Sequence, residues 1–512
     1  MWYFIFSRNL FNNILQNEKD KNIIISPFSI YQILALTSNG ASEETLKEML
    51  EVLIPYKNID NKIQNTINSN LIQIIEKITP EEEIGKEIKE DNKEENKLDK
   101  KFKNEEENEE ENEEENKEEN EEENEEENEE ENEKENKKEN KEENKEENDE
   151  ENYEIEGLIK LENANAIFVK KNFKILNEFS SMCSNYKALS SELKSVQQVN
   201  NWIKQKTHGK IPSVLPNNYD ISNIGLILVN AIYFKGNWMK NFYPYTEKRV
   251  FKNYDNKKVM VDTMNQLFNY YYYYEDEKIQ MISLPYDNSN NENSNMDYEM
   301  VIILPRDNKY SSTYDYLNKE NVNFTKLISK LKRVDEVELY LPKFEIEYEI
   351  SLNEILKKMG MKKAFSEYDA NFNRINDKEK LYIKDVFHKT FIKVDQDGTE
   401  AAAVTYIIDI PLCPPFGMEK ERYYMYVNHS FIFLITSNSI KDSDGNNLIL
   451  FLGIVNNINS TEYVNDYNDN NENNDNNDNI KEKIIIEINE NGGNRFNIIK
   501  VYSLLFLIII IL

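Results

Sequence analysis

Apolar residues recur along the first eighty positions with the spacing of helices. Over residues 4–15 and 58–79 they fall three or four apart, which places their side chains on one face of an α-helix. Residues 23–25 form a short apolar strand. Asn39-Gly40 ends one helix, and Ser42 can cap the helix that follows. This part of the chain therefore predicts four helices and one strand.

Beyond residue 160 the pattern becomes that of a sheet. Residues 164–169 are almost uninterruptedly apolar, as in a central strand that is buried on both faces. Residues 337–350 alternate between apolar and polar side chains, which is the period of a half-buried strand. Further strands are predicted over 225–234, within 258–305, over 381–394 and in a hairpin over 430–456, and helices around Trp202 and over 352–359, ending at Gly360.

An acidic segment interrupts this pattern. Residues 81–152 consist of E-E-E-N and K-E-E-N tetrads with almost no apolar residues. They carry about −26 of the formal net charge of −33, which leaves an ordinary charge balance for the remaining chain. Such a stretch cannot bury enough apolar surface to offset the entropy lost on ordering, so we expect a disordered insert. It is either an acidic arm that binds cations or a partner, or an expanded repeat without a role.

The C-terminal region has a biased composition as well. Residues 458–490 form an Asn/Asp-rich linker, and residues 491–512 end in an apolar tail shorter than the ~20 residues of a membrane-spanning helix. Asn491, Gly492 and Gly493, a short spacer and this tail match the signal for a glycolipid anchor. A short tail anchor and an extension without a role are the alternatives.

The first residues lack the basic start and the cleavage site of a signal peptide. A helix would begin almost at the first Met, so a signal upstream of this sequence stays an open alternative. We expect an extracellular or cell-surface location, with the cytoplasm as the alternative.

The composition argues against several classes of function. Cys183 and Cys413 are too few for a disulfide framework and are not spaced for metal binding. Only 3 His occur, none in a metalloprotease motif, and the chain has no nucleophile elbow or P-loop. The acidic balance opposes binding to nucleic acid. We therefore expect a protein that is not an enzyme and uses no metal or cofactor, with Cys183 as a buried thiol.

The most informative stretch is V-D-Q-D-G-T-E-A-A-A-V-T, residues 394–405. In an extended chain its small residues share one face, because successive side chains point to opposite sides of a strand. The small face comprises Thr399, Ala401, Ala403 and Thr405, and the opposite face Glu400, Ala402 and Val404. Gly398 in front adds a flexible pivot. The segment could insert between two strands of a sheet; on these residues alone, an Ala-rich loop or helix is the alternative.

Other segments match a known family in their order along the chain. They are N-I-I-I-S-P-F-S-I (22–30), L-T-S-N-G-A-S-E-E-T (36–45), V-N-N-W-I-K-Q-K-T-H-G-K-I (199–211), L-V-N-A-I-Y-F-K-G-N-W (228–238), S-L-P-Y (283–286), Y-E-M-V-I-I-L-P (298–305), L-Y-L-P-K-F-E-I-E-Y (339–348), L-K-K-M-G-M-K-K-A-F (356–365), H-S-F-I-F (429–433) and F-L-G-I-V (451–455). With the hinge at 394–405 they resemble the serpins. The resemblance covers residues 1–80 and 153–457, a single serpin domain in two parts around the acidic insert.

The resemblance implies an α+β fold of three β-sheets and about eight or nine helices, with an exposed reactive loop over about residues 395–428. It also implies a mechanism. A serine protease cleaves the loop, forms an acyl-enzyme, and is trapped as the cleaved loop inserts into the main sheet. The native fold would be metastable and held by a kinetic barrier. The small face of the hinge favours an inhibitor, although Gln396 stands where the family usually has Glu, and Asp409 would face inward.

Counting the usual family distance from Gly398 places the reactive bond between Leu412 and Cys413. Leu before this bond suits a chymotrypsin-like or subtilisin-like protease. Because the segment that follows is longer than usual, cleavage after Met418, Lys420 or Arg422 is the alternative, and Lys or Arg would select a trypsin-like protease.

The resemblance also assigns residues that control separation of the sheet strands. A polar cluster beneath the sheet would consist of Ser26, Ser29, Asn230 and His388. Trp238 would lie under the site where insertion begins. These residues would gate insertion without catalysing a reaction; ordinary core packing is the alternative for each.

We therefore expect a monomeric serine-type endopeptidase inhibitor that acts as a suicide substrate. One alternative is a non-inhibitory serpin that acts as a surface-displayed binding or chaperone-like protein. The other is a cross-class inhibitor of cysteine proteases.

Overall fold

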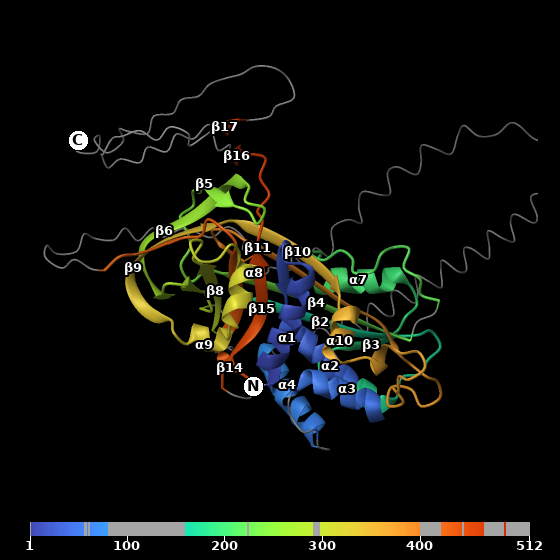
Figure 1. Cartoon of the computed structure of the whole chain (residues 1–512). Coiled ribbons are helices and arrows are strands. Elements are labelled where there is room, and N and C mark those ends of the chain that lie inside the picture. Colours follow the sequence, from blue (N-terminus) through green and yellow to red (C-terminus); the bar gives the residue numbers. More distant parts are fainter. Residues whose placement is uncertain are drawn as a thin grey trace, which may run out of the picture.

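A computed structural model describes residues 2–55, 59, 62–79, 159–222, 225–289, 297–399, 421–442, 445–464 and 486–487. Within these ranges the chain forms nine α-helices, one 3-10 helix and seventeen strands, which are hydrogen-bonded into two sheets (Figure 1).

The smaller sheet has six strands in the order β10-β11-β12-β4-β2-β3. They are β10 (Phe344–Ser351), β11 (Ile383–Val394), β12 (Gly398–Thr399), β4 (Leu226–Asn237), β2 (Lys160–Val169) and β3 (Leu189–Glu192). β2 pairs with β4 in antiparallel direction along all of its 10 residues. β4 and β11 run parallel at the centre of the sheet. The strands predicted over 164–169, 225–234 and 381–394 are thus confirmed.

The larger sheet has eleven strands and contains one long strand that is shared by two layers. β6 (Lys258–Glu275) pairs with β5 (Glu247–Lys252), with β9 (Lys332–Pro342) and with β7 (Ile279–Pro285). Register shifts on both sides of Asn269 interrupt its ladder with β9, and such irregularities bend a strand. The other strands are β1 (Ile23–Ile25), β8 (Tyr298–Pro305), β13 (Tyr423–Tyr426), β14 (Phe431–Lys441), β15 (Asn447–Val455), β16 (Tyr463–Val464) and β17 (Ile486–Glu487).

The α+β class is confirmed. Where the resemblance implies three sheets, hydrogen bonds among the described residues join the strands into two, because β6 belongs to two layers.

Helices cover both faces of the six-stranded sheet, and Figure 1 shows α7 on the side of β2 and β4 away from α2. Along β4, Leu226 and Leu228 join the core that contains α2, whereas Ile227 and Val229 join a smaller core that contains α7. The alternation of a strand thus explains why these residues are all buried. The helices are α1 (Trp2–Asn17), α2 (Pro27–Ser38), α3 (Glu43–Leu53), α4 (Ile63–Ile78), α6 (Asn177–Asn185), α7 (Val196–Lys206), α8 (Thr313–Glu320), α9 (Phe324–Ile328), α10 (Asn353–Met359) and the 3-10 helix η1 (Lys363–Phe365).

Helix α2 is the central helix, and all of its residues are buried. Its start follows the usual rules, because Pro27 occupies the first position and the side chain of Ser26 accepts a hydrogen bond from the Ser29 amide at 3.2 Å. Ser42 precedes α3 as predicted, but its side chain does not cap that helix. Its hydroxyl donates instead to Asn373 Oδ1 at 2.6 Å, so a tertiary partner replaces the expected local one.

Several predictions fall on residues that the structure does not describe. The insert 81–152 and the tail 491–512 lie outside the described residues, so the expected disorder and anchor signal stay predictions. Within the predicted linker 458–490, β16 pairs with β17 and with Val259 on β6. No helix in the described part of the chain is both long and apolar enough to cross a membrane.

Candidate functional site

The candidate site is the line along which β4 and β11 meet. The two strands pair directly from Ile383 and Leu226 up to Thr390 and Ile232. Above this point β12 lies between them, with Thr399 opposite Val394 on β11 and Gly236 on β4. The predicted hinge therefore begins inside the sheet.

Gly398 allows this close approach. A Cβ atom on Gly398 would lie 2.2 Å from the carbonyl oxygen of Gly236 and 2.8 Å from the Cα of Asn237. Both contacts are with backbone atoms, which cannot rotate away. Any larger residue would therefore push the hinge away from β4.

The next residue, Thr399, is fully buried and is held by a hydrogen bond. Its Oγ1 lies 2.7 Å from the phenolic oxygen of Tyr286, and the Tyr286 ring stacks on Trp238 with centroids 4.7 Å apart. The Trp238 indole N–H donates to the carbonyl oxygen of Asp395 at 2.9 Å, and its amide donates to that of Asp397 at the same distance. Trp238 thus contacts the turn that leads into the hinge.

Two buried polar atoms near this turn lack a hydrogen-bond partner. Among the described residues they are Gln396 Oε1 and Asn265 Nδ2. The backbone of Gln396 is satisfied, because its carbonyl oxygen accepts from the Phe242 amide at 3.1 Å. Beside it, burial raises the pKa of the Asp395 carboxyl, an effect that Asp397 increases and Lys343 opposes. Polar groups are therefore poorly satisfied at the upper end of the line between β4 and β11.

The middle of this line is polar as well, but its groups are paired. Asn230 on β4 and His388 on β11 are direct neighbours in the ladder, and the His388 Nδ1 is hydrogen-bonded to Asn230 Oδ1. His388 Nε2 accepts from the Ser26 amide at 3.1 Å, so the proton of the neutral ring is on Nδ1. Complete burial lowers the pKa of His388 from 6.5 to about 3. The imidazole is therefore neutral at physiological pH.

Three further residues, which sequence reasoning missed, complete this network. Asn230 Nδ2 donates to Ser29 Oγ and, at 2.5 Å, to Asn165 Oδ1. Asn165 Nδ2 donates to Asn163 Oδ1 at 3.1 Å, and Asn163 Nδ2 donates to Gln32 Oε1 at 2.6 Å. We call the set comprising Ser26, Ser29, Gln32, Asn163, Asn165, Asn230 and His388 the gate cluster. Two Asn at alternate positions of an apolar strand were the available signal, since they share one face of β2.

Other predicted residues are less informative. Several of them lie outside the described residues, namely Glu400 to Thr405, Leu412, Cys413, Met418, Lys420 and Asn491 to Gly493. Arg422 directly precedes β13, and its guanidinium pairs with the Glu336 carboxylate at 3.2 Å. Cys183 is buried, and its burial raises the pKa of the thiol to about 12. Arg422 and Cys183 therefore lie outside the line between β4 and β11.

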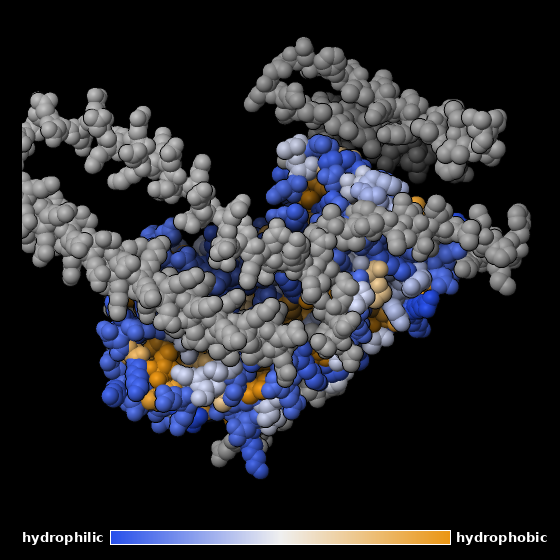
Figure 2. Space-filling model, turned by 180° about the vertical axis from the view of Figure 1, so that it is seen from behind, coloured by the Kyte–Doolittle hydropathy of each residue, from blue (hydrophilic) through white to orange (hydrophobic). Residues whose placement is uncertain are grey.

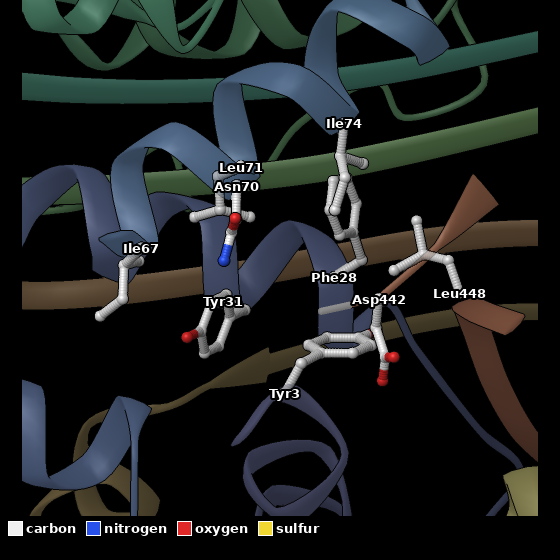
Figure 3. A pocket seen from close by; sticks show the side chains of 9 residues that line it. All are labelled: Tyr3, Phe28, Tyr31, Ile67, Asn70, Leu71, Ile74, Asp442 and Leu448. Carbon is white, nitrogen blue, oxygen red and sulfur yellow. The ribbon is translucent and has the colours of Figure 1, made fainter. Parts of the chain in front are cut away.

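A cavity between α1, α2 and α4 lies apart from this site (Figure 3). Its lining is mostly apolar, with Tyr3, Phe28 and Tyr31 below and Leu71 and Ile74 of α4 above. The volume is about 40 Å³, enough for a few water molecules and far below the several hundred Å³ of a ligand pocket. On the face seen from behind, the described surface is mostly hydrophilic with smaller hydrophobic areas (Figure 2). The line between β4 and β11, and not this cavity, is therefore the candidate functional site.

Comparisons with known proteins identify the family. A family model described as Serpin (serine protease inhibitor) matches residues 5–141 and 116–458. Iripin-2 of Ixodes ricinus is 33% identical over 316 residues, which cover 58% of this chain and 72% of that protein. Plasminogen activator inhibitor 2 of Homo sapiens is 31% identical over 314 residues, which cover 57% of this chain and 69% of that protein. Among solved structures, the thermophilic serpin tengpin in its native state has a TM-score of 0.63 and 26% identity, covering 89% of this chain and 94% of that chain.

Proposed function

This chain belongs to the serpin family, and on that premise we propose that it inhibits a serine-type endopeptidase by insertion of its reactive loop. In the proposed reaction the protease serine attacks the scissile carbonyl, the peptide bond breaks, and the N-terminal part of the loop stays attached as an ester. The loop from Gly398 onward then inserts between β4 and β11. The attached protease is carried along and distorted before water can hydrolyse the ester.

The position of β12 is the observation that carries this proposal. Gly398 and Thr399 already pair with β4 on one side, and Thr399 pairs with Val394 of β11 on the other, in antiparallel direction to both strands. Further residues of the loop would extend an existing ladder and would not have to start a new one. Insertion also replaces one parallel pairing by two antiparallel ones, which are slightly more stable per residue.

The side chains of the loop support the same proposal. Thr399 faces the core, so the alternation of a strand would direct Ala401, Ala403 and Thr405 to the same side. Their small volumes suit a path beneath which the gate cluster is closely packed. Asp409 would also face inward, and its burial would be costly unless it remained at the wet lower end.

The energy of insertion is large enough to drive the reaction. About ten added ladder hydrogen bonds at about 1 kcal/mol each give about 10 kcal/mol. Burial of the inward side chains adds to this amount. Since about 1.4 kcal/mol changes an equilibrium tenfold, insertion would be irreversible in practice.

Two relatives support a protease as the partner, because they are named as inhibitors of a plasminogen activator and of leukocyte elastase. For this chain we propose the Leu412–Cys413 bond as the bait and a chymotrypsin-like or subtilisin-like protease as the target. Arg422 is less suitable as bait, because its side chain pairs with Glu336 and the next residue starts β13. A protease requires several residues of free, extended chain on both sides of the bond.

The test is to mix the purified protein separately with chymotrypsin, subtilisin and trypsin. Denaturing gels would reveal a covalent complex, and mass spectrometry of the released C-terminal fragment would locate the cleaved bond. We expect a complex that resists denaturation, with cleavage after Leu412. Leu412→Asp is the matched bait variant and should abolish the complex with chymotrypsin. Cleavage without a complex by all three proteases would overturn the proposed function.

A further inference from the structure

A strand can enter between β4 and β11 only if the two strands move apart. β4 could move away from β11 without β2. It would then break its ladder with β2, which extends along all 10 residues of β2. If β2 and β4 move together, this ladder is kept. The pair must then slide across helix α2, so the contacts that hold it on α2 contribute to the barrier.

Asn163 of β2 is attached to α2 by two side-chain hydrogen bonds. Its Oδ1 accepts from the hydroxyl of Ser29, and its Nδ2 donates to Gln32 Oε1 at 2.6 Å. Gln32 is itself fixed, because its Nε2 donates to the carbonyl oxygen of Tyr186 at 2.9 Å. Asn163 therefore cannot move along α2 while these bonds persist.

The donors and acceptors of the gate cluster have a single consistent arrangement. The Ser26 amide can only donate, so His388 Nε2 accepts and His388 Nδ1–H donates to Asn230 Oδ1. At the other end the Tyr186 carbonyl can only accept, so the Gln32 amide presents its oxygen to Asn163. The orientation of each of these groups is therefore fixed by its neighbours, and a sliding motion would break these bonds.

Four side-chain hydrogen bonds of the cluster connect the moving pair β2–β4 with α2 and β11. Two of them belong to Asn230, which bonds to Ser29 and to His388. The other two are the bonds of Asn163 to Ser29 and Gln32. By contrast, the bond between Asn165 and Asn230 lies inside the moving pair and survives the motion.

From this geometry we infer that Asn163 is a positioning residue for loop insertion. It holds the β2–β4 pair on helix α2 and so keeps the sheet closed until a cleaved loop drives it open. This inference rests on the proposed function and deepens it. The side chain of Asn163 is hydrogen-bonded to Ser29, Gln32 and Asn165, so its effect on insertion is exerted through the position of the strands.

The test measures uptake of a loop peptide by the intact chain, so that no protease is needed. A fluorescent peptide with the sequence of residues 398–411, G-T-E-A-A-A-V-T-Y-I-I-D-I-P, is incubated with the protein, and the bound fraction is followed by anisotropy and on native gels. Asn163→Ala should take up the peptide about tenfold faster than the natural protein, because two bonds across the sliding boundary are lost.

Two further variants separate positioning from general destabilisation. Asn456→Ala is the matched control: the side chain of this buried Asn makes four hydrogen bonds, to Lys19, Lys21, Thr313 and Ser430, away from the six-stranded sheet. It should leave the uptake rate within about twofold of the natural rate, since it removes no bond at the sliding boundary. Gln32→Ala removes the partner of Asn163 and should accelerate uptake, and the double variant with Asn163→Ala should be faster than either by less than the product of the two effects.

The outcomes distinguish this inference from the proposed function. If the natural protein took up the peptide at the same rate as Asn163→Ala, or if Asn456→Ala accelerated uptake equally, the role of Asn163 would be overturned but the proposed function would not. Absence of uptake by every variant would overturn loop insertion itself, and with it both proposals. If Asn163→Ala does not fold, Gln32→Ala carries the same comparison, and its failure to accelerate uptake would overturn the role.

Discussion

Acidification should weaken this protein through one buried histidine. His388 is completely buried and neutral, with Nδ1–H donating to Asn230 and Nε2 accepting from the Ser26 amide. A proton added to Nε2 would remove the acceptor of the Ser26 amide and place a charge in the core. This is why burial lowers the pKa of His388 from 6.5 to about 3.

The sign and size of the effect follow from the two pKa values. Below pH 6.5 the unfolded chain binds a proton at this histidine that the folded chain excludes until about pH 3, so stability falls as the pH decreases through this window. At about pH 5.5 the unfolded state gains about 1.4 kcal/mol, and at about pH 7.5 it gains less than about 0.1 kcal/mol. The expected loss of stability between these two values is therefore about 1.3 kcal/mol.

Urea unfolding at the two pH values, followed by tryptophan fluorescence, measures this loss in the first unfolding transition. His388→Gln is the informative variant, because a glutamine amide can donate to Asn230 and accept from Ser26 without titrating. It should lose about 1.3 kcal/mol less than the natural protein on acidification. Burial also lowers the pKa of His429, which adds a loss of the same sign to both proteins and cancels in their difference. An equal pH dependence in the two proteins would refute the reasoning, and His208→Gln, at an exposed site, serves as the control.

Three other changes test the hinge and the core. Gly398→Ala should expel the hinge, because the new Cβ would lie 2.2 Å from a carbonyl oxygen of β4. Hydrogen exchange of the Thr399 amide should then accelerate at least about tenfold, and an unchanged exchange rate would contradict this expectation. Tyr286→Phe leaves the buried Thr399 hydroxyl unpaired and should lower the free energy of unfolding by about 1–2 kcal/mol. Adding Thr399→Val should recover part of that loss. If the two substitutions changed the free energy of unfolding additively in urea denaturation, the two side chains would not be coupled. In a Cys413→Ser variant, the Cys183 thiol should react with Ellman's reagent only after unfolding, because it is buried and its pKa is raised to about 12; reaction of the native protein would show that the site is accessible.

Much of the fold follows from hydrophobic pattern alone, where a strand has helices on both faces. β4 is such a strand, and its first nine positions are all buried, so its apolar run is unambiguous. The short helices α6, α8 and α9 were not predicted, because their few turns give too little periodicity to detect. The double membership of β6 was also missed, since it depends on which strands approach each part of a long strand.

The candidate site likewise has a part that the sequence can predict and a part that only the three-dimensional structure reveals. The hinge is a prediction from sequence, because its glycine and alternating small side chains stand among family segments that occur in the expected order; the structure describes Gly398 and Thr399 of these residues. The contact of Asn163 with Gln32 could not be predicted, because the two residues lie 131 positions apart and the contact depends on the register of β2 over α2. The orphaned oxygen of Gln396 likewise requires three-dimensional packing, although the departure from the usual Glu was visible in the sequence.

The upper end of the line between β4 and β11 differs from its middle, where the gate cluster lies, and this difference predicts the order of events during insertion. At the upper end direct pairing of β4 and β11 has ceased, the hinge is in place, and Gln396 Oε1 and Asn265 Nδ2 are buried without partners among the described residues. Each such atom costs about 1–3 kcal/mol, so rearrangement there meets little resistance. Further down, at the gate cluster, the His388–Asn230 bond would have to break before the strands separate, and by our inference the bonds of Asn163 would have to break as well. The first residues of the loop would therefore insert easily and the barrier would lie at the gate cluster. Substitutions at Thr399 should alter how far the hinge is inserted before cleavage, while substitutions at Asn163 should alter the rate afterwards. Because the two positions act on separate steps, their effects on the free-energy barrier should add.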